Sequence, residues 1–173
     1  MDEGIRFDPE LRFNEDSCFN AVIIARTPHT RVGQIRTHSP VYAWIRRKNS
    51  VTTGSDAPDY GAWGQFNRNL KVTEENRLHR EPDNYAGMVT RTAYDTFYML
   101  HDMRISPQMK RRISDEFIPW MRKRMNVFGK VSREILEQIR GVSRGELLEP
   151  GEEIPDSHET VRAWVNKITG ARA

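Results

Sequence analysis

The sequence predicts an α+β fold that is mainly helical, with a small N-terminal β element and an arm packed on three or four C-terminal helices. A short apolar run rich in β-branched residues lies near the N-terminus, and segments with helical apolar spacing follow one another after Asp83. The chain has 173 residues, of which 37% are hydrophobic, and this length suits one domain. We therefore expect an arm over residues 1–16 and a single domain over residues 17–173.

The N-terminal segment is predicted to be an arm because residues 1–16 are polar and have no clear period. Phe7, Leu11 and Phe13 are the residues that can anchor it. The next segment, residues 18–26, has the sequence CFNAVIIAR. It is short, apolar and rich in β-branched residues, which predicts a strand.

The chain after this strand contains Pro28 and two further candidate elements. Residues 31–36 are predicted to form a second short strand. Ser39 followed by Pro40 has the pattern of a helix start, and a strand through the same residues is the alternative. Residues 17–48 are thus predicted to form a small β/helix element.

Residues 49–82 show no convincing period and are predicted to be a long irregular loop. Three aromatic residues are spaced along it: Tyr60, Trp63 and Phe66. Structureless stretches of this length are uncommon in compact domains and are usually functional, disordered or held by a partner. Two interpretations stay open: the aromatic side chains hold the loop on its own core, or they dock it on another chain.

Residues 83–173 are predicted to form the helical region of the domain. The predicted helices span about residues 83–103, 106–125, 132–141 and 156–170. Residues with a preference for helix N-caps stand at their starts. The last helix is predicted to begin with a capping box formed by Asp156 and Glu159.

Positive charge gathers around the second of these helices. The chain carries 27 Lys and Arg against 24 Asp and Glu, but residues 104–133 hold nine basic residues and two acidic ones. At 100° per residue, Phe117 and Trp120 fall on an apolar arc and are predicted to be buried. Four cations fall on the opposite arc: Arg111, Arg112, Arg122 and Lys123. They are candidates for binding nucleic acid or an acidic partner, and a solvated helix face is the alternative.

The C-terminal segment loosely resembles a helix-turn-helix. The resemblance covers residues 142–149 and 154–165; residues 146–148 would end the first helix, and residues 160–164 would lie on the recognition helix. The residues that would face a DNA groove are Ser157, His158, Glu159 and Arg162. The connection is longer than the usual turn and the stretch is acidic, which opposes approach to DNA. A terminal helix packed into the core explains the same residues with fewer assumptions.

The residues form no catalytic constellation. The chain has no phosphate-binding loop, its five histidines lack metal-ligand spacing, and neither Cys18 nor any serine lies in a nucleophile signature. We therefore expect no enzymatic activity, no cofactor and no metal site. One cysteine also excludes a disulfide framework.

Two features bear on the location of the protein. The longest apolar stretch, residues 21–25, is far below the ~18 residues that a membrane span needs. The chain starts with Met1, Asp2 and Glu3, whereas a secretory signal starts with basic residues. The sequence predicts no membrane partner, no secretion through a signal peptide, and a location in the cytoplasm or within a viral particle.

The sequence therefore predicts a non-enzymatic structural or interaction subunit of a larger assembly. Its expected partners are other protein subunits, in a homo- or hetero-oligomer, and nucleic acid is a further candidate. A virion or phage component would fit the modest core, the long irregular segments and the lack of a catalytic motif. The alternative is a small DNA-binding regulator that uses the C-terminal segment.

Overall fold

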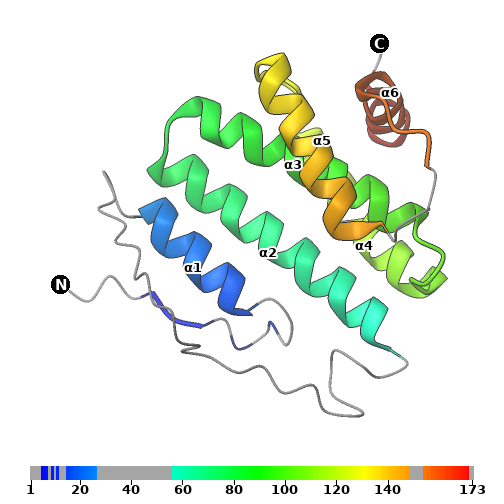
Figure 1. Cartoon of the computed structure of the whole chain (residues 1–173), viewed down its shortest axis with the longest axis horizontal. Coiled ribbons are helices and arrows are strands. Elements are labelled where there is room, and N and C mark those ends of the chain that lie inside the picture. The colour runs from blue at the N-terminus through cyan, green and yellow to red at the C-terminus, as the bar shows by residue number, and fades with distance from the viewer. Residues whose placement is uncertain are drawn as a thin grey trace, which may run out of the picture.

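The computed structural model describes residues 5–7, 9, 11, 15–26, 56–148 and 154–171. Within these residues every regular element is a helix (Figure 1). The helices are α1 (Glu15–Arg26), α2 (Ala57–His79), α3 (Pro82–His101), α4 (Pro107–Arg122), α5 (Arg133–Leu147) and α6 (His158–Thr169). The predicted α+β class is therefore wrong for the described part of the chain, whose fold is all-helical.

The segment predicted to be the first strand forms α1 instead. Its buried residues are Cys18, Val22 and Ala25, and this spacing places them on one side of a helix. Two acidic residues in the first turn and Arg26 in the last complement the helix dipole. Because β-branched residues lower helix propensity only slightly, the packing of this buried stripe against α2 decides the structure.

Parts of the predicted arm contact α1. Leu11 is buried against this helix, and the rings of Phe7 and Phe19 stack with their centroids 4.3 Å apart. Three predicted features lie outside the described residues: Phe13, the strand over residues 31–36 and the helix start at Ser39.

The predicted loop over residues 49–82 is wrong from Ala57 onward, where the chain forms the 23-residue helix α2. Pro58 lies in its first turn, where a proline removes no helical hydrogen bond. The helix buries polar Asn69 and Thr73 beside apolar residues. The sequence therefore lacks the continuous apolar stripe that usually identifies a helix.

Helix α3 runs through the centre of the molecule and packs against α2, α4, α5 and α6 (Figure 1). Every residue from 92 to 99 is buried. The hydroxyls of Thr90, Thr92 and Thr96 each donate to the carbonyl four residues earlier. These bonds satisfy the hydroxyls within the helix itself. The threonine side chains of α3 can therefore be buried in the core without requiring other hydrogen-bond partners.

Helix α4 begins where the sequence predicts. Ser106 Oγ accepts a hydrogen bond from a backbone N–H of the first turn at 3.2 Å, which is the geometry of an N-cap. Phe117 is fully buried and Trp120 is partly buried, as the apolar arc predicts. Phe117 also stacks on Trp164 of α6, with the ring centroids 5.6 Å apart.

Two predicted helix boundaries are wrong, at the end of α5 and at the start of α6. Helix α5 continues past Gly141 to Leu147, because an exposed glycine costs a helix only about 1 kcal/mol and α5 packs on α3. Ser157, and not Asp156, caps α6 by accepting a backbone hydrogen bond at 3.1 Å. Helix α6 ends as predicted at Gly170, which has a left-handed φ of 72°.

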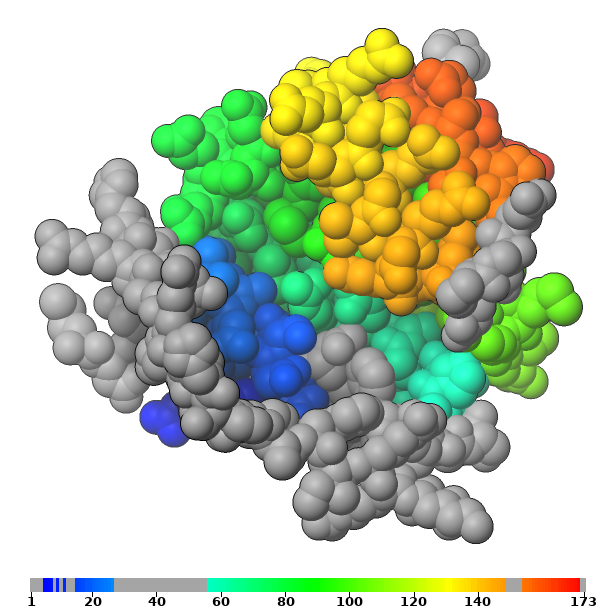
Figure 2. Space-filling view, in the orientation of Figure 1, coloured from blue at the N-terminus to red at the C-terminus, as the bar shows by residue number. Residues whose placement is uncertain are grey.

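Helix α5 covers much of the face shown in Figure 2, with α1 to one side of it and α6 to the other. The core beneath joins residues of α2, α3, α4 and α6. None of the helices described in the structure is long and apolar enough to span a bilayer.

Candidate functional site

The four cations predicted to form a binding face lie on the exposed side of α4 and at its end. Arg111 and Arg112 are near the start of the helix, and Arg122 and Lys123 are at its end. Corresponding members of the two pairs are separated by about 16 Å at the helical rise of 1.5 Å per residue. The structure thus places two cations at each end of one helix face.

Acidic side chains lie between the two pairs. Asp115 and Glu116 are exposed, one helical turn beyond Arg111 and Arg112 respectively. Opposite charges at this spacing lower the local positive potential. The excess of positive charge therefore lies toward the C-terminal end of α4.

Two of the four cations contact neighbouring helices. The guanidinium of Arg112 lies over the Trp63 ring of α2, 3.6 Å from the ring centroid. Arg122 Nε donates to the carbonyl of Thr169 at the end of α6, at 2.9 Å. Within the described part of the chain, Lys123 has no side-chain hydrogen bond or ion pair.

The turn after α4 places Lys130 next to the start of α6, where Arg162 lies. Gly129 has a φ of 71°, a left-handed conformation that favours glycine. A β-carbon at this position would lie 3.1 Å from Arg162 Nη2 of α6, so the turn lies directly against α6. Lys130 and Arg162 are both exposed. We call Arg122, Lys123, Lys130 and Arg162 the basic surface.

The three aromatic residues of the predicted docking loop lie on α2. Phe66 is fully buried, and Trp63 is partly buried beneath Arg112. Tyr60 is 44% exposed. Phe66 therefore belongs to the core of the chain itself, and Tyr60 is the member of the trio with a large exposed area.

The residues of the helix-turn-helix resemblance are divided between the core and the surface. His158 Nδ1 lies 3.0 Å from the Tyr94 hydroxyl, and the His158 ring also contacts Phe128. Burial, together with the charge of Arg162, lowers the pKa of His158, and burial raises the pKa of Tyr94 to about 12. Glu159 and Arg162 are exposed, so His158 faces the core while these two face solvent.

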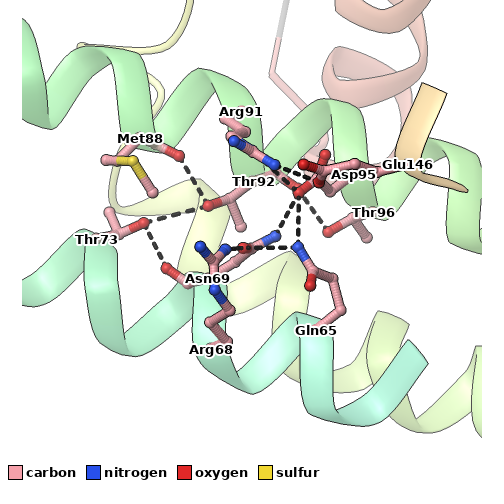
Figure 3. A network of polar contacts seen from close by, with 10 residues as sticks. All are labelled: Gln65, Arg68, Asn69, Thr73, Met88, Arg91, Thr92, Asp95, Thr96 and Glu146. Atoms are coloured by element: carbon pink, nitrogen blue, oxygen red, sulfur yellow. Dashed lines mark hydrogen bonds and ion pairs between the residues drawn. The ribbon is translucent and has the colours of Figure 1, made fainter. Parts of the chain in front are cut away.

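A buried polar network joins α2, α3 and α5 (Figure 3). Asp95 is fully buried, and its Oδ2 accepts a hydrogen bond from Asn69 Nδ2 at 2.7 Å. Arg91 Nε lies 3.5 Å from the same oxygen, and Arg91 also forms an ion pair with Glu146 of α5. Polar groups that bond one another in a low-dielectric interior specify how their helices align.

Asp156, which the sequence assigns to the cap of α6, instead ties the segment before α6 to α3 and α5. It accepts hydrogen bonds from the Tyr98 hydroxyl, from Arg140 and from Arg144. Burial and the hydrogen bond to Asp156 raise the pKa of Tyr98. This carboxylate therefore connects three parts of the chain, a role that requires the tertiary structure and leaves no signal in the local sequence.

Comparison of the chain with protein-family models, with curated proteins and with solved structures gives no match. Across the residues that the structure places, no group of three or more His, Cys, Asp and Glu side chains is arranged to hold a metal ion. The functional argument therefore depends on the basic surface and its contacts.

Proposed function

We propose that this chain is a non-enzymatic interaction subunit whose basic surface docks on the phosphates of nucleic acid within a larger assembly, such as a viral particle. One observation supports this proposal most strongly. Lys123, Lys130 and Arg162 form no ion pair with any carboxylate that the structure describes, although all three are exposed. Arginine and lysine side chains of this kind are the usual ligands of phosphate oxygens.

An acidic protein surface has less support as the partner. The acidic C-terminal stretch is one surface that a neighbouring copy could present to the basic surface. In that stretch Glu146 already pairs with Arg91, and Asp156 pairs with two arginines of α5. Hydrogen bonds from its own backbone and from Ser157 lower the pKa of Glu159. Glu146 and Asp156 are therefore paired within the chain, while Glu159 is exposed.

Binding of a fluorescently labelled DNA duplex, followed by anisotropy over a range of salt concentrations, tests the proposal. We expect the affinity to fall with salt, with a log–log slope of about −0.9 for each phosphate neutralised. Lys123→Gln should weaken binding and make the slope less steep by about one unit.

Arg111→Gln is the matched control for this experiment. It removes the same charge from the same helix, but at the end where Asp115 and Glu116 already lower the potential. We expect it to leave the slope unchanged. Reversal of Lys123, Lys130 and Arg162 to Glu should abolish binding and preserve the helical circular dichroism. Failure of the unmodified chain to bind, or DNA binding that survives the reversal, would contradict the proposal.

A further inference from the structure

A cavity of about 440 Å³ lies where α1, α2, α3 and α5 meet. A volume of this size suits a small-molecule ligand. Part of its wall is apolar and includes Met99, Ile105 and Leu147. The rest of the wall carries charged side chains, and their pairing decides what the cavity can bind.

Three of the charged side chains in the wall have partners. Arg104 Nη2 donates to Asp102 Oδ2 at 2.7 Å, and Arg104 Nε donates to Asp102 Oδ1 at 3.0 Å. Glu146 forms an ion pair with Arg91. The remaining charged residue of the wall is Arg68.

Arg68 is partly buried and has no ion pair with the residues that the structure describes. Its Nη1 donates to Asn69 Oδ1 at 3.2 Å, while its buried Nε finds no acceptor there. Burial, with the nearby charge of Arg91, lowers the pKa of Arg68, although the charges of Asp95 and Glu146 act in the opposite direction. A guanidinium has five N–H donors, and burying its charge without a partner is costly.

The buried carboxylate of the neighbouring network is committed to other groups. Asp95 Oδ2 accepts from Asn69 at 2.7 Å and from Gln65 at 3.4 Å, and it lies 3.5 Å from Arg91 Nε (Figure 3). Asp95 Oδ1 is buried without a hydrogen-bond partner in the described structure. Within the described residues, Arg68 is therefore the cation of the cavity wall that has no carboxylate at ion-pair distance.

We propose that this cavity binds a small carboxylate, held by the Arg68 guanidinium with its short apolar chain against Met99, Ile105 and Leu147. A carboxylate and a guanidinium match in a two-point hydrogen-bonded geometry. The apolar wall removes the hydrocarbon part of the ligand from water, which favours binding. The site is separate from the basic surface, which belongs to α4, the turn after it and α6.

This assignment makes a prediction that a structural role for Arg68 does not make. A partly buried guanidinium with no carboxylate at ion-pair distance contributes little to the unliganded fold, so Arg68→Gln should leave its Tm unchanged or raise it. The same substitution should remove the stabilisation that a ligand provides by binding only the folded state.

Thermal unfolding of the full chain in sodium butyrate tests the proposal, with sodium chloride and inorganic phosphate at equal ionic strength as comparisons. We expect the Tm of the unmodified chain to rise with butyrate and reach a plateau, and not to do so with chloride. Arg68→Gln should lose this rise. Arg77→Gln, the same substitution at an exposed arginine of α2, should keep it.

Arg68→Lys provides a second variant that retains the charge and lacks the planar fork, so its butyrate response should be smaller than that of the unmodified chain. Equal responses of the unmodified chain to butyrate and chloride would overturn the proposal. A rise that Arg68→Gln retains, or a response to phosphate alone, would also overturn it. An unliganded Tm of Arg68→Gln well below that of the unmodified chain would assign Arg68 to the fold and reject the site.

Discussion

The α2–α3–α5 interface and the basic surface use the same residue types in opposite ways. At the interface, Arg91 joins the carboxylates of Asp95 and Glu146. On the basic surface, Lys123 and Lys130 have no carboxylate partner within the described ranges. The difference teaches that carboxylates at the interface align helices, whereas these exposed lysines are left for contacts outside the described chain.

This difference predicts different responses to mutation. Removing one partner of a buried charge pair leaves the other charge uncompensated, which costs stability. Removing an exposed cation changes little in the fold because that cation is solvated. Substitution of a buried carboxylate that joins separate parts of the chain should therefore lower the stability of the fold. Substitution of a cation of the basic surface should instead weaken binding.

The largest effect is expected for Asp156→Ala. The substitution removes the acceptor of Tyr98 and of two arginines, so we expect a loss of about 2–4 kcal/mol in the free energy of unfolding. Urea unfolding followed by circular dichroism measures it. Glu137→Ala is the control, because Glu137 also pairs with Arg140 but its side chain is 59% exposed, against 3% for Asp156. The control should lose less than about 0.5 kcal/mol, and equal losses would contradict the comparison.

A smaller effect is expected from acid. Because the pKa of His158 is lowered in the folded chain, the unfolded chain binds a proton there at a higher pH than the folded chain does. Stability should therefore fall as the pH drops below about 6.5, the ordinary pKa of histidine. His158→Gln should show a shallower fall than the unmodified chain in urea unfolding at pH 7.5, 6.5 and 5.5. Identical pH profiles would mean that His158 is not held in its neutral form.

The smallest effect is expected on the basic surface itself. Lys123→Gln combined with Lys130→Gln should change the free energy of unfolding by less than about 0.5 kcal/mol, because both side chains are exposed. The same urea experiment measures this change. A loss of unfolding free energy comparable to that of Asp156→Ala would show that these lysines stabilise the fold, which would contradict their assignment to a binding surface.

The helices after residue 82 could be predicted because their apolar residues recur with the helical period. Phe117 and Ser106 illustrate the two signals, one from a buried stripe and one from a cap. Helix α1 was hidden by its β-branched residues, whose strand preference is a matter of context. Helix α2 was hidden because it buries polar Asn69 and Thr73, which bond other helices and break the apolar pattern.

The candidate site was only partly accessible from the sequence. The exposed side of α4 follows from periodicity, so Arg122 and Lys123 could be named. Lys130 and Arg162 lie near each other because the turn at Gly129 packs against α6, a tertiary contact that the sequence pattern does not show. The pairing of Asp156 and the unpaired state of Arg68 depend on contacts between distant helices, which local patterns do not encode.

Mapping of backbone amide chemical shifts during titration with a DNA duplex tests the central claim most directly. The account predicts shifts that begin at Lys123, Lys130 and Arg162 and that weaken as salt is added. It predicts no early shifts at Asn69 and Asp95, whose side chains bond each other in the interior. Shifts confined to the interface, or no shifts at the basic surface at low salt, would contradict it.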